Sequence, residues 1–78
     1  PAVELAKRVG RAGGTYPAVF NAANEVAVDA FHDGRIGFLG ILDTVERVVE
    51  AHEPPAALTR ESLADAEDWA RRTAAELL

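Results

Sequence analysis

The sequence predicts an all-α domain built from four helices. Apolar residues recur every three or four positions in four segments, and no segment shows the sustained alternation that is typical of a strand. Three turn signals separate these segments, namely Gly13-Gly14, Asp33-Gly34 and Glu53-Pro54-Pro55. Because 78 residues leave no room for a second core, we expect residues 1–78 to form a single domain.

The first two helices are expected at about residues 2–11 and from just after Thr15 to about His32. The first is short and needs tertiary contacts to be stable; its expected buried side consists of Val3, Ala6 and Val9. In the second, Thr15 is suited to the N-cap, and Pro17 is tolerated in the first turn. The expected apolar arc of this helix consists of Phe20, Ala23, Val26, Ala27, Ala30 and Phe31.

The last two helices are expected at about residues 38–51 and after Thr59, which is suited to the N-cap. At the C-terminal end of the third helix, His52 is expected to act as a cap, because a cation is favoured there. The stripe of the third helix consists of Phe38, Ile41, Leu42, Val45, Val48 and Val49. The inner face of the fourth consists of Leu63, Ala66, Ala70, Ala74 and Leu77, flanked by Trp69 and Thr73.

Many of the predicted buried positions are alanine, which lets helix axes approach closely but gives a thin core. We therefore expect an exposed apolar face that a partner covers. Trp69, the only tryptophan, is expected to anchor the core or an interface. Asp68 and Arg72 are expected to form an ion pair at the i, i+4 spacing.

Composition excludes several classes of function. A net charge of −5 argues against nucleic-acid binding and against adhesion to anionic membranes. The chain has no cysteine, hence no disulfide framework, and no apolar run approaches the roughly 20 residues that span a bilayer. It begins with proline and contains no methionine, so we expect a piece of a longer protein.

Asn21, Asn24 and Glu25 are the candidate functional residues of the second helix. Asn24 is expected to lie inside the apolar arc, with Asn21 at its edge and Glu25 outside it. A buried amide needs hydrogen-bond partners or costs about 1–3 kcal/mol. The favoured interpretation is that Asn24 ties a neighbouring loop or helix end to this helix. The alternative is that Asn21, Asn24 and Glu25 contact another domain; a catalytic role is the least favoured.

Two other groups of residues are candidate sites. Glu25, Asp29 and His32 share one helix face and could bind a divalent metal, although a solvated acidic face is the favoured interpretation, since a metal site needs ligands from a second helix. Ser62, the only serine, lies in a Glu-Ser-Leu triplet that invites comparison with small acidic carrier proteins, but it opens the last helix rather than the second. Neither a Ser/His/Asp nor a Cys/His set indicates a nucleophile.

A long motif carries a family resemblance. The stretch GGTYPAVFNAANEVAVDAFHDGRIGFLGI, residues 13–41, resembles the C-terminal helical domain of the 1-deoxy-D-xylulose 5-phosphate reductoisomerase family, and ADAEDWAR, residues 64–71, resembles its acidic segment before Trp-Ala-Arg. The resemblance covers essentially the whole chain. One departure is His32, where the family usually has leucine, which puts burial of that position in doubt.

The resemblance implies a bacterial, cytoplasmic parent enzyme of the non-mevalonate isoprenoid pathway. That enzyme rearranges a phosphosugar and reduces the product with NADPH, using a divalent cation (Mg or Mn), and it is a V-shaped homodimer. Its metal carboxylates, phosphate-binding residues and lid lie in earlier domains. The resemblance therefore implies that no catalytic, cofactor-binding or metal-binding residue lies in this chain.

The role that the resemblance implies is that of a brace for the active-site cleft. Asn21, Asn24 and Glu25 would then fix the second helix against an interhelical loop or the catalytic domain. By analogy with the family, a left-handed superhelix is expected rather than a simple up-and-down bundle, with a partly open bundle as the alternative. The alternative function is a free-standing helical interaction module that offers an alanine-lined groove to a partner helix.

Overall fold

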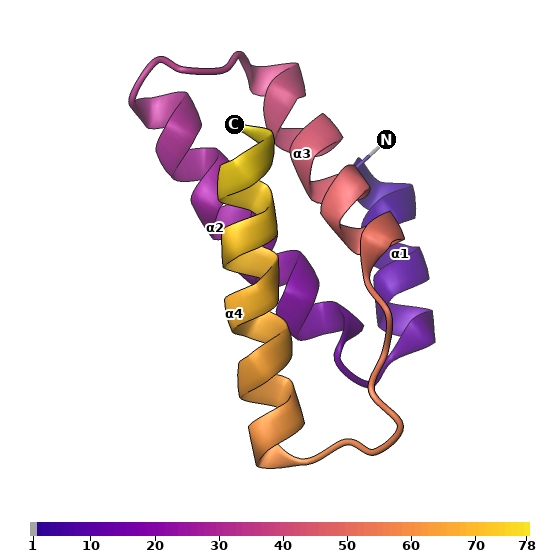
Figure 1. Ribbon diagram of the computed structural model, residues 1–78. Helices are drawn as coiled ribbons and strands as arrows, with labels where there is room; N and C mark the ends of the chain where they lie inside the picture. Colours follow the sequence, from indigo (N-terminus) through magenta and orange to yellow (C-terminus); the bar gives the residue numbers. More distant parts are fainter. Residues whose placement is uncertain (1) are drawn as a thin grey trace.

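The computed structural model describes residues 2–78, which form four α-helices (Figure 1). The helices are α1 (Ala2–Ala12), α2 (Tyr16–His32), α3 (Phe38–Ala51) and α4 (Arg60–Leu77). Each lies close to its predicted range, and no strand occurs between residues 2 and 78. The all-α, four-helix prediction is confirmed, while the left-handed superhelix stays a prediction.

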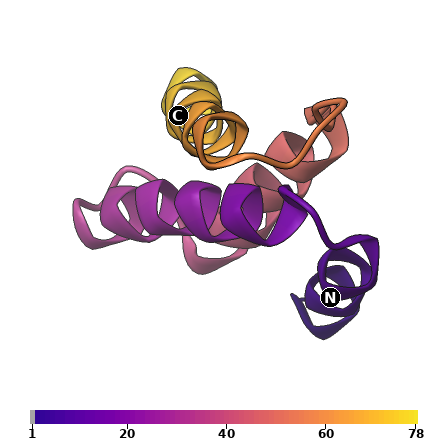
Figure 2. The ribbon, with the colours of Figure 1, turned by 90° about the horizontal axis from the view of Figure 1, so that it is seen from below.

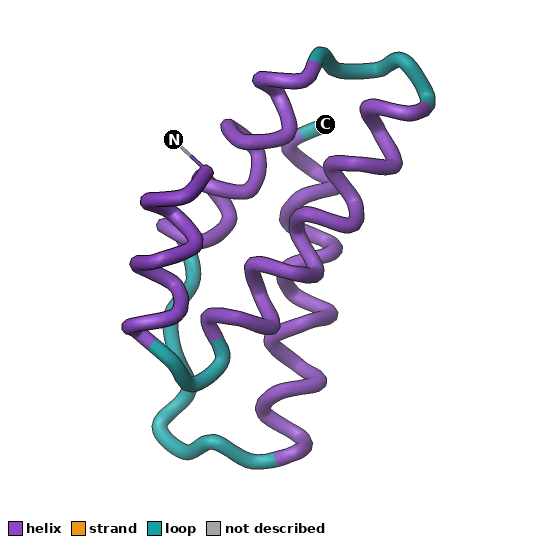
Figure 3. Tube along the Cα trace, turned by 180° about the vertical axis from the view of Figure 1, so that it is seen from behind, coloured by secondary structure: helices purple, strands orange, loops and turns teal. Residues whose placement is uncertain are grey.

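The central helix is α2, which packs against α1, α3 and α4. Viewed from below, α1 and α4 lie on different sides of α2 (Figure 2). The connection between α2 and α3 lies at the upper end of Figure 1, whereas the α1–α2 and α3–α4 connections lie at the lower end. The view from behind shows the same arrangement, with the start of α1 and the end of α4 in the upper half (Figure 3).

The core is thin and rich in alanine, as the sequence predicts. Val19, Val45 and Val48 are among the largest apolar side chains that are almost fully buried. Around them α2 and α4 contribute small residues, which let their axes approach closely. The buried alanines are Ala22, Ala23, Ala27, Ala30, Ala66, Ala70 and Ala74. Trp69, Phe20 and Tyr16 are only partly buried and pack against this cluster, so the predicted anchoring role of Trp69 is confirmed.

Local turn chemistry explains where the helices end. Gly34, beyond the C-cap of α2, adopts a φ of +77°, which favours glycine, and its N–H donates to the carbonyl of Phe31. Gly13 and Gly14 adopt φ values of +63° and +57° between α1 and α2. At the start of α4, Thr59 and Ser62 form a reciprocal capping box. The predicted breaks at Gly13-Gly14 and Asp33-Gly34 and the N-cap at Thr59 are therefore confirmed.

The predicted buried face of α1 is confirmed at Val9 and wrong at Val3 and Ala6. Val3 is 65% exposed and Ala6 is exposed, whereas Leu5 and Val9 are buried. Leu5 and Val9 are spaced i, i+4, so they lie on one side of a helix, and Leu5 buries more apolar surface than alanine can. The contact of α1 with α2 therefore depends on Leu5 and Val9.

Apolar residues at several helix ends are exposed, although they were assigned to inner faces. Phe31 and Leu77 are each 38% exposed, and Phe38 is 74% exposed. The hydrophobic stripes of α2, α3 and α4 thus extend beyond the part of each helix that another helix covers. The predicted exposed apolar surface is present in the structure. None of the helices in residues 2–78 has the length and hydrophobicity needed to cross a membrane.

Candidate functional site

The polar residues of α2 that the sequence singles out lie on its surface. Asn21, Asn24 and Glu25 are all exposed. The prediction that Asn24 lies inside the apolar arc is wrong. On the helical wheel it lies about 40° beyond Phe20, and Phe20 itself is only partly buried, so the covered face of α2 ends before it reaches Asn24.

The tie between Asn24 and a neighbouring loop is also absent. None of the side-chain hydrogen bonds found between described residues involves Asn21 or Asn24. The favoured interpretation of Asn24 as an internal tie is therefore wrong. The two amides form a polar surface strip on α2, and the contact with another domain stays a prediction.

Glu25 extends from the same helix toward α4. Its carboxylate lies 3.5 Å from the Arg71 guanidinium, which also lies 3.9 Å from Asp68. Asp68 therefore pairs with Arg71 at i, i+3, and the predicted partner Arg72 is wrong. These side chains are largely solvated, and exposed ion pairs contribute only about 0–1 kcal/mol. The pairs orient the Glu25 carboxylate more than they stabilise the fold.

The metal alternative finds no support in the geometry. Among the residues that the structure describes, no group of three or more His, Asp or Glu side chains could hold a metal ion. His32 is exposed and its ring lies at the edge of the Phe31 ring, with the centroids 5.8 Å apart. The doubt about burial at position 32 is thereby resolved in favour of exposure.

The best-defined polar contact in the domain involves His52 and Thr15. The His52 Nε2 and the Thr15 Oγ1 share a hydrogen bond of 2.7 Å, and both side chains are buried. Thr15 occupies the N-cap position of α2, as predicted, but its hydroxyl makes no capping bond to the helix. His52 occupies the C-cap position of α3, as predicted, yet its ring contacts the start of α2 instead of the last turn of α3.

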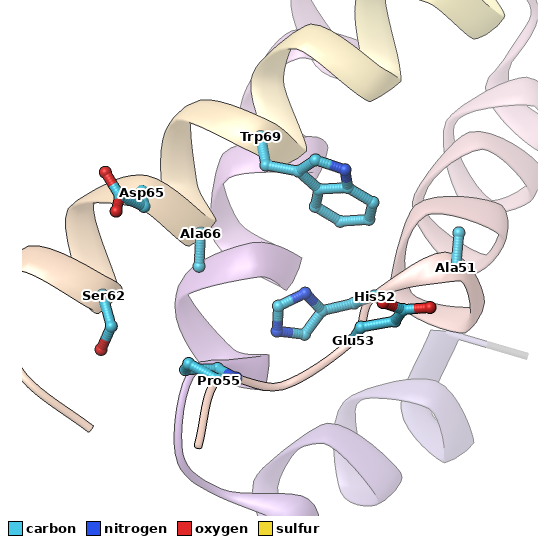
Figure 4. Close-up of a pocket in the computed structure, with 8 residues that line it drawn as sticks. All are labelled: Ala51, His52, Glu53, Pro55, Ser62, Asp65, Ala66 and Trp69. Atoms are coloured by element: carbon cyan, nitrogen blue, oxygen red, sulfur yellow. The ribbon is translucent and has the colours of Figure 1, made fainter. Parts of the chain in front are cut away.

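Two aromatic rings hold the His52 ring in place. Tyr16 meets it edge-on with centroids 5.0 Å apart, and its hydroxyl donates a 3.5 Å hydrogen bond to the His52 carbonyl. Trp69 lies on α4, and the centroids of the Trp69 and His52 rings are 5.3 Å apart. Figure 4 shows the Trp69 and His52 rings next to one another, and both residues line a surface cleft. His52 therefore joins the ends of α2 and α3 to the middle of α4. We call His52, Thr15, Tyr16 and Trp69 the His52 cluster.

Burial lowers the pKa of the His52 imidazole below its ordinary value of 6.5, because removing a charged ring from water is unfavourable. The neutral ring is therefore the form that the fold favours. One ring nitrogen shares the hydrogen bond with Thr15, and the roles of donor and acceptor depend on the tautomer.

The cleft beside His52 is lined in part by Glu53, Pro55, Ser62 and Asp65. The side chains of Asp65 and Ser62 extend away from the His52 ring (Figure 4). The Ser62 hydroxyl accepts from the Thr59 N–H at 2.8 Å and donates to the carbonyl of Ala57 at 2.9 Å. A hydroxyl engaged in a helix cap, with its neighbouring histidine bonded elsewhere, is not arranged for nucleophilic attack.

Sequence reasoning missed the His52 cluster. Thr15 and His52 lie 37 residues apart, and each has a sufficient local explanation as a cap residue. The sequence offered one signal for this cluster. Trp69 is a large aromatic residue on the inner side of a helix whose other inner residues are mostly alanine. Such a large ring needs other large side chains to pack against, and the His52 ring is one of them.

Comparison with known proteins supplies the family. Residues 1–73 match the model of the DXP reductoisomerase C-terminal domain. Relatives named 1-deoxy-D-xylulose 5-phosphate reductoisomerase include one from Leifsonia xyli subsp. xyli, 73% identical over 78 residues, which is all of this chain and 22% of the relative. Another, from Pseudarthrobacter chlorophenolicus, is 58% identical over 78 residues, again all of this chain and 20% of the relative.

A third such relative, from Streptomyces coelicolor, is 54% identical over 80 residues, covering 99% of this chain and 19% of the relative. The chain therefore spans about a fifth of the length of the curated relatives it matches. The identities are high, and the family model covers 73 of the 78 positions. This chain belongs to the family of DXP reductoisomerase C-terminal domains.

Proposed function

We propose that this chain is a non-catalytic brace in a 1-deoxy-D-xylulose 5-phosphate reductoisomerase. The parent enzyme rearranges its phosphosugar substrate and reduces the product with NADPH to 2-C-methyl-D-erythritol 4-phosphate, a step of non-mevalonate isoprenoid biosynthesis in the bacterial cytoplasm. The parent acts as a homodimer. Residues 1–78 form one domain of it, and the remaining domains of the parent chain are the partners.

NADPH and the divalent cation are bound by other parts of the parent. Within residues 2–78 the acidic side chains do not converge into a metal site, and no strand is present to begin a dinucleotide-binding turn. The residues of this chain thus do not fit either group, and no chemical step is assigned to them.

The observation that carries the proposal is that both His52 and Ser62 are engaged in structural contacts. His52 is bonded to Thr15, and Ser62 belongs to the cap of α4. At the same time the amides of Asn21 and Asn24 are exposed on the central helix, and no side-chain hydrogen bond within residues 2–78 uses them. Such residues are suited to contacts with a neighbouring domain.

The proposed contact surface is the strip of α2 that carries Asn21, Asn24 and Glu25. Arg71 holds the Glu25 carboxylate from α4, so the acid is oriented before contact. Amide and carboxylate groups accept and donate hydrogen bonds of defined direction, and each such bond fixes the angle between the two domains. The strip therefore positions the brace against the catalytic domain or one of its loops.

The free-standing interaction module is not favoured by any particular observation. Its defining feature is an alanine-lined groove, but alanines of α2 and α4 are buried together in the core cluster. They are thus already used within the domain.

The test is Asn24→Leu in the full-length reductoisomerase, with Arg72→Leu on the exposed side of α4 as the control. If α2 forms the contact, Asn24→Leu lowers Tm or kcat, because an interdomain amide loses its partners. Arg72→Leu leaves both unchanged. If both Tm and the kinetic constants are the same in Asn24→Leu and the unmodified enzyme, the assignment is wrong. Turnover by the purified 78-residue chain alone would contradict the non-catalytic role.

A further inference from the structure

A second surface of the domain is apolar and lies at one end of it. Phe31 is in the last turn of α2, and Phe38 and Leu39 form the first turn of α3. Phe38 is 74% exposed and Leu39 is 79% exposed, while Phe31 is 38% exposed. We call these three residues the apolar end patch. The end of α2 and the start of α3 meet at the upper end of Figure 1.

The two rings of the patch form an ordered pair. The Phe31 and Phe38 centroids lie 6.1 Å apart with the ring planes 74° from parallel, an edge-to-face arrangement. Gly34 and its positive φ fix the turn that brings the two rings together. The patch is therefore a preformed surface, and grouped exposure of large apolar side chains marks an interaction site.

The occupant follows from the end of the domain at which α1 begins. The first turn of α1 lies in the upper half of Figures 1 and 3, the same half as the α2–α3 connection. Val3, in the first turn of α1, is also 65% exposed. The relatives extend far beyond the matched region, of which this chain spans 22% in the Leifsonia protein, and the family model is a C-terminal domain.

We propose that the apolar end patch packs against residues that precede this domain in the same reductoisomerase chain. The inference rests on the proposed function, because it takes the domain as part of a longer enzyme. It adds a second contact surface, distinct in chemistry from the polar strip of Asn21, Asn24 and Glu25. The apolar contact stabilises the packing of the domain by removing apolar surface from water. The hydrogen bonds of the polar strip fix the orientation of the domain.

The size of the patch favours a covalently linked occupant over a separate chain. A stable interface between separate chains buries about 800 Å² on each partner, more than three side chains provide. A segment of the same polypeptide is present at a high effective concentration, so a small contact suffices. The patch is thus suited to an intrachain contact rather than to association of two copies.

The experiment is thiol labelling of Leu39→Cys in the full-length reductoisomerase, with the labelled site identified by peptide mass spectrometry. Residue 39 is exposed in the domain, so the substitution removes little internal packing. Ala64→Cys, at an exposed position on α4, is the matched control. Each rate is divided by the rate of the same variant in concentrated urea, which corrects for intrinsic reactivity.

The expected result is at least tenfold protection of the thiol from Leu39→Cys, unchanged when the protein is diluted. Ala64→Cys should show less than twofold protection. If Leu39→Cys reacts within twofold of its unfolded rate, the patch is open and the inference fails. Protection that disappears on dilution would assign the patch to a second copy and also overturn it. Neither readout involves Asn24, so failure of the polar-strip proposal is detected separately by Asn24→Leu.

Discussion

The Thr15 hydroxyl and the His52 imidazole, 37 residues apart in the sequence, share a buried hydrogen bond of 2.7 Å. The bond joins the N-cap residue of α2 to the C-cap residue of α3. Two helix ends that carry opposite partial charges are thereby held together through side chains rather than through their backbones. Trp69 adds the third helix, α4, to this junction.

Thr15→Val should therefore destabilise the domain by about 1–3 kcal/mol, because it leaves a buried imidazole nitrogen without a partner. Valine has nearly the shape of threonine, so packing changes little. The free energy of unfolding, measured by urea titration, is the readout. Thr73→Val, at a partly buried position on α4, is the control and should cost less.

A double-mutant cycle with His52→Leu isolates the bond itself. Once the imidazole is absent, Thr15→Val should cost clearly less than in the unmodified protein, with a coupling of roughly 0.5–3 kcal/mol. If the two substitutions are additive, Thr15 does not act through His52.

The stability of the domain should fall in mildly acidic solution. Burial holds the pKa of His52 below its ordinary value of 6.5, so the folded state binds fewer protons than the unfolded state. Stability therefore increases with pH, and the loss begins as the pH falls through 6.5 and continues until the folded-state pKa is passed. Unfolding curves followed by Trp69 fluorescence between about pH 5 and pH 8 would measure this loss.

The groups around the ring define the control for this experiment. The Tyr16 hydroxyl contacts the His52 backbone, and the carboxylates of Glu53 and Asp65 line the adjacent cleft. His52→Gln should flatten the pH dependence over this range, whereas His32→Gln, at an exposed position, should preserve it. Equal slopes for His52→Gln and the unmodified protein would assign the effect to other groups.

The cap of α4 is a local feature whose contribution can be measured alone. The Ser62 N–H donates to the Thr59 Oγ1 at 3.0 Å, and the Thr59 N–H donates to the Ser62 Oγ at 2.8 Å. Thr59→Ala should cost about 1 kcal/mol of stability, since it removes a side-chain acceptor from the first turn. Thr59→Ser keeps the hydroxyl and should restore nearly all of the loss. A loss that is the same in both variants would mean that the hydroxyl is not responsible.

Local signals in the sequence were sufficient for the helices but not for their junctions. Thr59, Gly34 and the double glycine before α2 act on their own immediate backbone, so their effects can be predicted from neighbouring residues. The Thr15–His52 bond depends on how α2 and α3 meet, which no local pattern encodes. The misplaced face of α1 is a different case, because the i, i+4 spacing of Leu5 and Val9 is a local pattern.

The candidate site on α2 also shows what local sequence patterns cannot predict. The position of Asn24 on the helical wheel was right, but the width of the face that α1, α3 and α4 cover decides whether it is buried. That width depends on the packing of whole helices. The family motif, in contrast, extends over residues 13–41 and identified the family from sequence alone, as the match of residues 1–73 confirms.

The close contact of α4 with α2 should tolerate no larger side chain at Ala70. This alanine is fully buried, as are Ala23 and Ala27 on the facing helix. Ala70→Leu adds three carbon atoms at a fully buried position, and overpacking of this kind costs about 1–3 kcal/mol. Ala64→Leu, on the exposed side of the same helix, should change stability by about 0.5 kcal/mol or less. Thermal unfolding of the two variants distinguishes packing from helix propensity, because the substitution is identical and only the burial differs. Equal Tm values would show that α4 does not depend on small residues to reach α2.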